Sequence, residues 1–246
     1  MKFFDWGDIY MAKSNNAKYI TGSDVPRTLK DHPFYGFTLD AEQIAFRDAI
    51  WNPEKLIVFC NAKAGTGKTF IATATANLLV QYGFYEGIVY ISSPTQESKL
   101  GFLPGEIEDK TAVYSEPFME ALMKLNINPY TAVNQYNVMN QKNGTAYIDA
   151  ITHVYLRGCN FENKVIIIDE AQNYYCDELK KTLTRMSDSC KVIVIGHSGQ
   201  IDLYHNPENS GFVRYLNHFK DDPRTEVCEL NTNYRGWISS HADELE

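Results

Sequence analysis

The sequence predicts an α/β protein with a mostly parallel, doubly wound sheet and helices on both faces. Short runs of β-branched and apolar residues, typical of strands buried on both faces, alternate with helical patterns. Such alternation is the order of β-α-β units with right-handed crossovers. The chain has 246 residues, 44% hydrophobic and 22% charged, which is enough for one large core. Its formal net charge of −8 excludes polyanion binding through bulk positive charge.

The expected elements follow one another from residue 40 onward. Residues 1–36, which include two prolines, are expected to form an irregular arm on a main domain of residues 37–246. Asp40 can cap a first helix together with Gln43. The predicted strands are residues 56–60, 88–91, 165–168 and 192–195. The other predicted helices are residues 69–81, 117–125, 177–186 and 211–219.

Cysteine spacing and hydropathy indicate where the protein works. The five cysteines are an odd number, and none has a partner at zinc-binding spacing. Reduced thiols are typical of a cytoplasmic protein. No apolar stretch approaches the roughly 18 residues that a membrane span needs. We therefore expect a cytoplasmic protein with no membrane partner.

A glycine-rich loop follows the first predicted strand. It reads Ala62, Lys63, Ala64, Gly65, Thr66, Gly67, Lys68 and Thr69, a phosphate-binding (Walker A) pattern with alanine at its first glycine. The glycines let backbone N–H groups surround a phosphate at a helix N-terminus. Lys68 is expected to contact the β- and γ-phosphates, and the Thr69 hydroxyl to ligate Mg²⁺. A chance glycine-rich turn is the alternative, but the strand before it and the helix after it favour nucleotide binding.

Two acidic residues, Asp169 and Glu170, end the strand predicted at 165–168. Parallel sheets bind ligands at the carboxyl ends of their strands. Asp169 is therefore expected in the Mg²⁺ shell, and Glu170 is expected to orient or deprotonate the attacking water. The alternative is an acidic pair that caps the next helix through its dipole.

Polar residues after later strands are further candidates. Gln200 follows the strand at 192–195 and is positioned to bond a γ-phosphate or its water. His197 in the same loop is more simply a surface or packing residue. An arginine that stabilises the transferring phosphoryl group is also expected. The candidates are Arg157, Arg185, Arg214 and Arg235, and their own residue contexts do not separate them.

Further blocks make the chain similar to the PhoH-like ATPase family. They are residues 100–106 (LGFLPGE), 156–158 (LRG), 168–173 (IDEAQN), 200–203 (QIDL) and 210–212 (SGF). The resemblance covers roughly residues 38–236 and implies a RecA-like P-loop NTPase related to the superfamily 1 helicase core. The chain looks most like the short members carried by bacteriophages. This implies a location in the bacterial cytoplasm, or in an infected host cell.

The resemblance also implies ligands and roles. It implies ATP and Mg²⁺ as cofactors, Gln43 as the residue that reads adenine, and Arg235 as the arginine on the γ-phosphate. The chain departs from the family pattern at three positions. Ala62 replaces a glycine, His197 stands where an acid is usual, and Ser93 replaces an arginine before a proline.

These features predict an Mg²⁺-dependent ATP hydrolase coupled to RNA or single-stranded DNA. The resemblance implies a homo-oligomeric ring, with a hexamer expected, in which an arginine crosses the interface. The aromatic-containing loops at 101–104 and 130–136 are candidate nucleic-acid contacts. One alternative is a slow ATP-gated binding module that acts through protein partners. The other is a small-molecule kinase.

Overall fold

A single six-stranded parallel sheet organises the protein. The computed structural model describes residues 25–93, 113–134, 146–156, 158–201 and 210–243. The strand order is β3-β2-β4-β5-β1-β6, and every neighbouring pair is parallel. The strands are β1 (Ile57–Ala62), β2 (Gly87–Ser92), β3 (Ile148–Thr152), β4 (Lys164–Ile168), β5 (Lys191–Gly196) and β6 (Thr225–Leu230). The predicted doubly wound α/β fold is confirmed.

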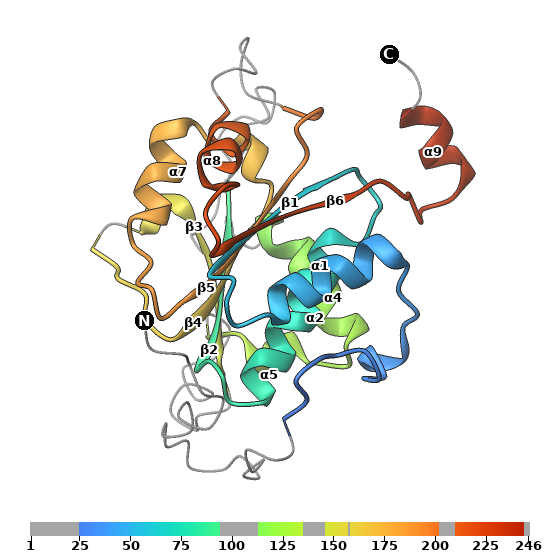
Figure 1. The fold of residues 1–246 in the computed structure, drawn as a ribbon, viewed down its shortest axis with the longest axis horizontal. Helices are drawn as coiled ribbons and strands as arrows, with labels where there is room; N and C mark the ends of the chain where they lie inside the picture. The colour runs from blue at the N-terminus through green and yellow to red at the C-terminus, as the bar shows by residue number, and fades with distance from the viewer. Residues whose placement is uncertain (1–24, 94–112, 135–145, 157, 202–209, 244–246) are drawn as a thin grey trace.

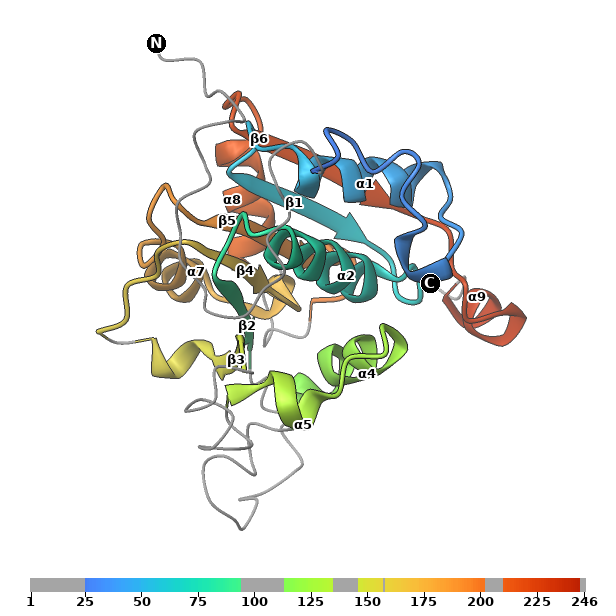
Figure 2. The same ribbon diagram turned by 90° about the horizontal axis from the view of Figure 1, so that it is seen from below.

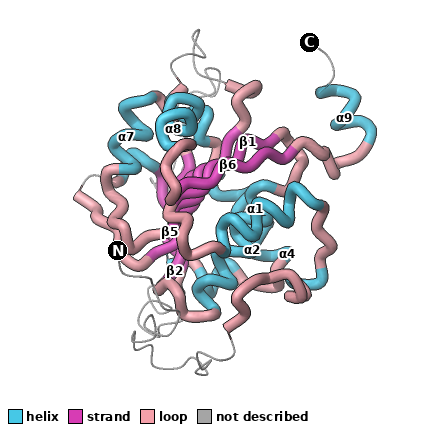
Figure 3. The backbone as a smooth tube through the Cα atoms, in the orientation of Figure 1, coloured by secondary structure: helices cyan, strands magenta, loops and turns pink. Residues whose placement is uncertain are grey.

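Helices cover both faces of this sheet (Figures 1 and 2). One layer contains α1 (Ala41–Trp51), α2 (Lys68–Gln81), α4 (Glu116–Lys124) and α5 (Pro129–Ala132). The opposite layer contains α7 (Cys176–Leu183) and α8 (Gly211–Phe219), and α9 (Trp237–Asp243) lies beyond the end of β6. The short 3₁₀ turns are η1 (Phe34–Gly36), η2 (Val113–Ser115), η4 (His153–Tyr155) and η5 (Ala171–Asn173). Figure 3 shows the strands enclosed between these two sets of helices.

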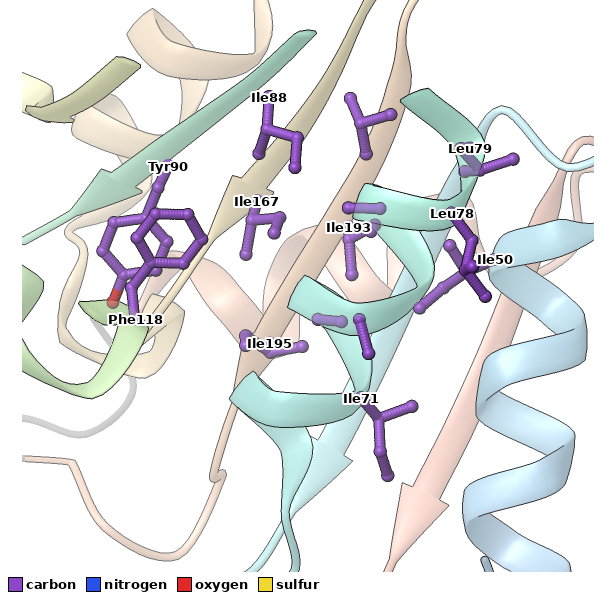
Figure 4. Close-up of a cluster of buried hydrophobic side chains, with 14 of the residues drawn as sticks. Ile50, Ile71, Leu78, Leu79, Ile88, Tyr90, Phe118, Ile167, Ile193 and Ile195 are labelled. Atoms are coloured by element: carbon purple, nitrogen blue, oxygen red, sulfur yellow. The ribbon is translucent and has the colours of Figure 1, made fainter. Parts of the chain in front are cut away.

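The core has two parts because successive side chains of a strand point to opposite faces. Ile167 and Ile193 belong to the cluster that packs against α2 and α4 (Figure 4). Ile166 and Val194 belong to the cluster on the α7–α8 face. The central strands are therefore buried on both faces, which explains why they appear in the sequence as continuous apolar runs.

Two strands and one helix end differ from the sequence prediction. The structure adds β3 and β6, and both are edge strands. In β6 the partly exposed Glu226 and the exposed Glu229 interrupt the apolar residues. The criterion of a continuous apolar run therefore misses both strands. The predicted helix at 177–186 ends at Leu183 instead, because Arg185 and Met186 close turns onto Thr182 and Leu183.

The part of the predicted arm that the structure describes, residues 25–36, lies against the main body. Leu29 and Phe34 are buried, and Trp51 Nε1 donates to the Pro26 carbonyl at 3.2 Å. Across the described ranges, no helix combines the length and apolar character needed to cross a bilayer.

Candidate nucleotide site

The predicted site residues gather at one edge of the sheet. Because all six strands are parallel, their carboxyl ends meet there. The phosphate loop follows β1, the acidic pair follows β4, His197 follows β5, and Asn231–Arg235 follow β6. The order β2-β4-β5-β1-β6 makes these segments neighbours, although they span more than 140 residues of sequence.

The phosphate loop has the backbone conformation that its glycines predict. Gly65 and Gly67 have φ of +76° and +82°, in the left-handed region that favours glycine. Lys68 begins α2 directly after Gly67. Ala62 is the last residue of β1 and is not among the described residues with positive φ. Its position therefore does not require glycine, and the departure from the family pattern leaves the loop intact.

Neighbouring elements hold the loop in place. Gln43 Nε2 in α1 donates to the Thr66 carbonyl at 2.9 Å, and Lys63 N donates to the Leu230 carbonyl at 3.0 Å. The Gln43 amide oxygen accepts from the Asp40 N–H at 3.2 Å as part of the predicted capping box. The side chain expected to read adenine therefore also fastens α1 to the phosphate loop. One amide hydrogen of Gln43 is left for a ligand.

Asp169 is a buried carboxylate with three donors. Its Oδ2 accepts from Thr69 Oγ1 and from the Tyr90 hydroxyl, each at 2.9 Å. Its Oδ1 accepts from the Glu170 N–H at 2.8 Å. Burial and the neighbouring Glu170 carboxylate raise the pKa of Asp169, and the charge of Lys68 opposes that rise. A buried carboxylate of this kind is stabilised by a cation beside it.

Glu170, unlike Asp169, is half-exposed. Its Oε1 is 3.8 Å from Lys68 Nζ, and its Oε2 accepts from Gln172 Nε2 at 2.6 Å. The backbone of Glu170 is left-handed, with φ 50° and ψ 40°. The two acids of the pair therefore have separate partners, and neither of them caps α7.

Gln172 connects Glu170 to the loop after β5. The Gln172 amide oxygen accepts from the His197 N–H at 3.0 Å. A Cβ added at Gly196 would lie 2.9 Å from that same oxygen, so the close approach requires glycine. Gln200 lies in this loop and its N–H donates to the His197 carbonyl at 3.2 Å. Among the described residues, its side chain makes no hydrogen bond to Glu170 or Lys68.

The segment after β6 lies against the phosphate loop. Tyr234 N donates to the Gly65 carbonyl at 2.9 Å, and Asn233 Oδ1 accepts from the Arg235 N–H at 2.8 Å. A Cβ added at Gly65 would lie 3.0 Å from Arg235 Cγ. Arg235 is thus beside the phosphate loop of its own chain.

The other arginine candidates lie elsewhere or are not described. Arg185 precedes β5 at the opposite edge of the sheet, and Arg214 is exposed on α8. Arg157 lies outside the described residues, as does the block at 100–106.

Thr69 and Asp169 fit the predicted Mg²⁺. A hydroxyl and a carboxylate oxygen already lie 2.9 Å apart, and Mg²⁺ prefers a few such oxygens together with water and phosphate. Within the described ranges, no cluster of three or more His, Cys, Asp or Glu side chains is arranged to hold a metal ion. Thr69 and Asp169 would hold the ion together with phosphate oxygens of a nucleotide and with water.

Three residues of this site had no role in the sequence interpretation. Tyr90 contacts Asp169, Gln172 contacts Glu170, and Asn233 contacts the backbone of Arg235. The available signal was position: Gln172 stands inside the block at 168–173, and Asn233 stands two residues before Arg235. Tyr90 resembles an ordinary core aromatic within a strand, and the direction of its hydroxyl depends on the tertiary structure.

Comparison with known proteins agrees with this geometry. The family described as PhoH-like protein matches residues 38–235, which is most of the chain. The chain belongs to the PhoH-like family. The matched range contains the phosphate loop, the acidic pair and Arg235. The predicted family is confirmed, and with it a nucleotide-binding P-loop fold.

Relatives from several bacteria share this region. Protein PhoH of Escherichia coli K12 is 33% identical over 179 residues, covering 72% of this chain and 48% of the relative. Protein PhoH2 of Bacillus subtilis is 31% identical over 188 residues, covering 74% of this chain and 41% of the relative. A PhoH-like protein of Mycobacterium leprae is 34% identical over 191 residues, covering 76% and 52%. The chain thus spans about half the length of these relatives.

Solved helicase structures are more distant. The Hef helicase domain of Pyrococcus furiosus aligns with a TM-score of 0.46 and 17% identity, over 78% of this chain and 38% of that chain. The helicase MrfA bound to DNA aligns with a TM-score of 0.43 and 13% identity, over 79% and 27%. At these values neither similarity bears on function.

Proposed function

We propose that this protein hydrolyses ATP with Mg²⁺ and couples hydrolysis to RNA or single-stranded DNA within a ring of identical subunits. The observation that carries the proposal is a pair of contacts. Thr69 Oγ1 lies 2.9 Å from Asp169 Oδ2, and Lys68 Nζ lies 3.8 Å from Glu170 Oε1. They join the phosphate loop to two carboxylates 100 residues further along the chain. Pure nucleotide binding needs the loop but not Glu170.

The mechanism assigns one task to each group. Backbone N–H groups of the phosphate loop hold the phosphates, and Lys68 contacts the β- and γ-phosphates. A bound Mg²⁺, held by Thr69 and Asp169, supplies neutralising charge for the phosphate oxygens. Once Lys68 turns to a phosphate, Glu170 Oε1 is released to accept a proton from the attacking water. Gln172 holds the other oxygen of Glu170 and so keeps the carboxylate oriented.

Specificity and charge stabilisation are assigned to the segments beside the loop. Gln43 is held at the phosphate loop by its hydrogen bond to the Thr66 carbonyl. Its second amide hydrogen is left to recognise a base, which supports ATP as the substrate. Arg235 next to Gly65 is the proposed contact of the γ-phosphate. Gln200 is proposed to join the site when the phosphate is bound.

Coupling to nucleic acid has a weaker basis in the described residues. Tyr130 on α5 is 70% exposed, and a base can stack on such a ring. The second predicted contact, the loop at 101–104, lies outside the described residues. The formal net charge of −8 requires that any nucleic-acid path be a local one.

The test is phosphate release from ATP by the wild type and by Glu170→Gln, with Glu162→Gln as the matched control. Glu162 is exposed and lies just before β4, at the opposite edge of the sheet. Loss of a general base typically costs about 10²–10⁴ in rate. We expect at least a hundredfold loss for Glu170→Gln, retained nucleotide binding, and no loss for Glu162→Gln.

Adding single-stranded RNA or DNA to the same assay tests the coupling. Stimulated turnover supports the motor, and turnover without stimulation limits the proposal to an ATPase. Nucleotide binding without any turnover would instead identify an ATP-gated module that acts through protein partners.

A further inference from the structure

Tyr90 is a buried tyrosine whose hydroxyl contacts the nucleotide site. It lies in β2 and its side chain is 1% exposed. Its ring stacks on Phe118 of α4, with centroids 4.4 Å apart and planes at 13° (Figure 4). Its hydroxyl donates to Asp169 Oδ2 at 2.9 Å. Packing therefore fixes the ring, and the ring fixes the position of the hydroxyl.

Asp169 Oδ2 is also the atom that orients Thr69. A threonine hydroxyl has one proton and two lone pairs. Thr69 gives its proton to Asp169 Oδ2, so its lone pairs remain available to a cation. The direction of those lone pairs depends on where Oδ2 lies. Tyr90 holds Oδ2, and the Glu170 N–H holds Oδ1.

We propose that Tyr90 is a positioning residue for the divalent cation that accompanies the nucleotide: it fixes Asp169 Oδ2 and thereby directs the lone pairs of Thr69. This inference rests on the proposed function. Groups that orient the ligands of a metal typically change its affinity by about 10–100-fold when they are removed. The stacked pair of Tyr90 and Phe118 also connects α4 to the site. The position of α4 therefore affects how well the cation is held.

The experiment separates this role from simple packing. In the full chain, Tyr90→Phe keeps the stacked ring and removes only the hydroxyl. Mg²⁺ is titrated against the binding of a fluorescent non-hydrolysable ATP analogue, and the analogue is also bound in EDTA. We expect the half-saturating Mg²⁺ concentration to rise about tenfold or more, with affinity in EDTA unchanged. Electron paramagnetic resonance with Mn²⁺ in place of Mg²⁺ should show that the ion, together with the same analogue, binds more weakly to Tyr90→Phe than to the wild type.

Tyr147→Phe is the matched control. It also removes a tyrosine hydroxyl from a hydrogen bond, here to Asn77 Oδ1 at 2.7 Å, but at a distance from Asp169. Its half-saturating Mg²⁺ concentration should equal that of the wild type. If Tyr90→Phe does not fold, Phe118→Leu is tested instead, because it loosens the ring while keeping the hydroxyl. It should also raise the half-saturating Mg²⁺ concentration.

Three results would decide against the inference or its basis. An unchanged half-saturating Mg²⁺ concentration in Tyr90→Phe, or in Phe118→Leu where that variant replaces it, would falsify the inference. An equal loss of affinity with Mg²⁺ and in EDTA would also overturn it, since that is the signature of a packing role. If the wild type binds the analogue neither with Mg²⁺ nor in EDTA, the proposed function itself is overturned.

Discussion

The backbone conformation of Glu170 gives the two acids of the pair different partners. Glu170 is a non-glycine residue in the left-handed region, a conformation that costs about 1–3 kcal/mol where the surroundings enforce it. The bond from its N–H to Asp169 Oδ1, at 2.8 Å, offsets part of that cost. The turn directs Asp169 to Thr69 and Glu170 to Lys68. In the proposed function, the first acid serves the cation and the second acid serves the attacking water.

Lys191 at the start of β5 carries a prediction about pH. Its side chain is 1% exposed, and its Nζ donates to the carbonyls of Asn52, at 2.6 Å, and of Lys55. Burial, followed by the charge of Lys55, lowers the pKa of Lys191 from 10.5 to about 7. Between those values the unfolded chain binds more protons than the folded protein, so this lysine makes stability rise with pH. Below pH 7 both states are protonated and the effect is constant.

Lys191→Met removes that dependence. We expect the free energy of unfolding in urea, wild type minus Lys191→Met, to increase from pH 7 to pH 9 by up to about 1.4 kcal/mol per pH unit. Other titrating groups cancel in this difference, because both proteins contain them. Parallel stability curves for the two proteins would show that Lys191 is not held with a lowered pKa.

At the residue scale, the sequence predicts some residues of the candidate site and misses others. Lys68, Thr69, Asp169 and Glu170 stand in short patterns whose spacing reflects local chemistry, and the structure brings all four together. Tyr90 reaches the site only because β2 pairs with β4, which is a tertiary fact. The roles of Lys68, Thr69, Asp169 and Glu170, like those of Gln43, Gln200 and Arg235, stay predictions.

At the scale of elements, central and edge strands differ in how visible they are in the sequence. The central strands β1, β2, β4 and β5 are buried on both faces, and their continuous apolar runs predict them. The edge strand β3 alternates buried residues with partly exposed ones such as Asp149, and the edge strand β6 contains partly exposed or exposed residues such as Glu229. Short segments that mix apolar and polar residues are weak signals for a strand. The sequence therefore predicts the central strands and misses the edge strands.

The start of α1 carries a prediction about stability. Asp40 Oδ1 accepts from the Gln43 N–H at 2.8 Å, and Asp40 also accepts from the Tyr234 hydroxyl. Loss of such a cap costs typically about 1 kcal/mol, whereas asparagine caps about as well as aspartate. We expect Asp40→Ala to lower the free energy of unfolding in urea by about 1 kcal/mol or more. Asp40→Asn should keep most of it, and equal stability of the two variants would contradict the capping role.

At the scale of the whole molecule, one parallel sheet collects residues from most of the matched family range at one edge. The chain spans 48% of its Escherichia coli relative and 41% of its Bacillus subtilis relative. The matched family range, residues 38–235, contains the phosphate loop, both acids and the arginine beside the loop. This range therefore contains the groups that we propose bind the nucleotide.

Helix α9, at the end of the described chain, is our candidate for the contact between subunits of the proposed ring. Beyond Arg235, α9 lies away from both helical layers (Figures 1 and 2). Its Trp237 is 75% exposed and its Ile238 is 78% exposed. Large adjacent apolar side chains with this exposure indicate a contact surface. Because α9 follows the segment that touches Gly65, a second copy bound there would lie next to the nucleotide, as a ring requires.

The double variant Trp237→Ser/Ile238→Ser tests this contact. Light scattering after gel filtration should give the wild type a mass several times the 28.1 kDa of one chain, and should give the variant a mass nearer to one chain. Met123→Ser/Val154→Ser is the matched control, because it removes exposed apolar side chains from α4 and η4 and should leave the assembly unchanged. A wild type that stays monomeric with and without ATP would contradict the ring. An oligomer that survives in the α9 variant would place its interface elsewhere on the molecule.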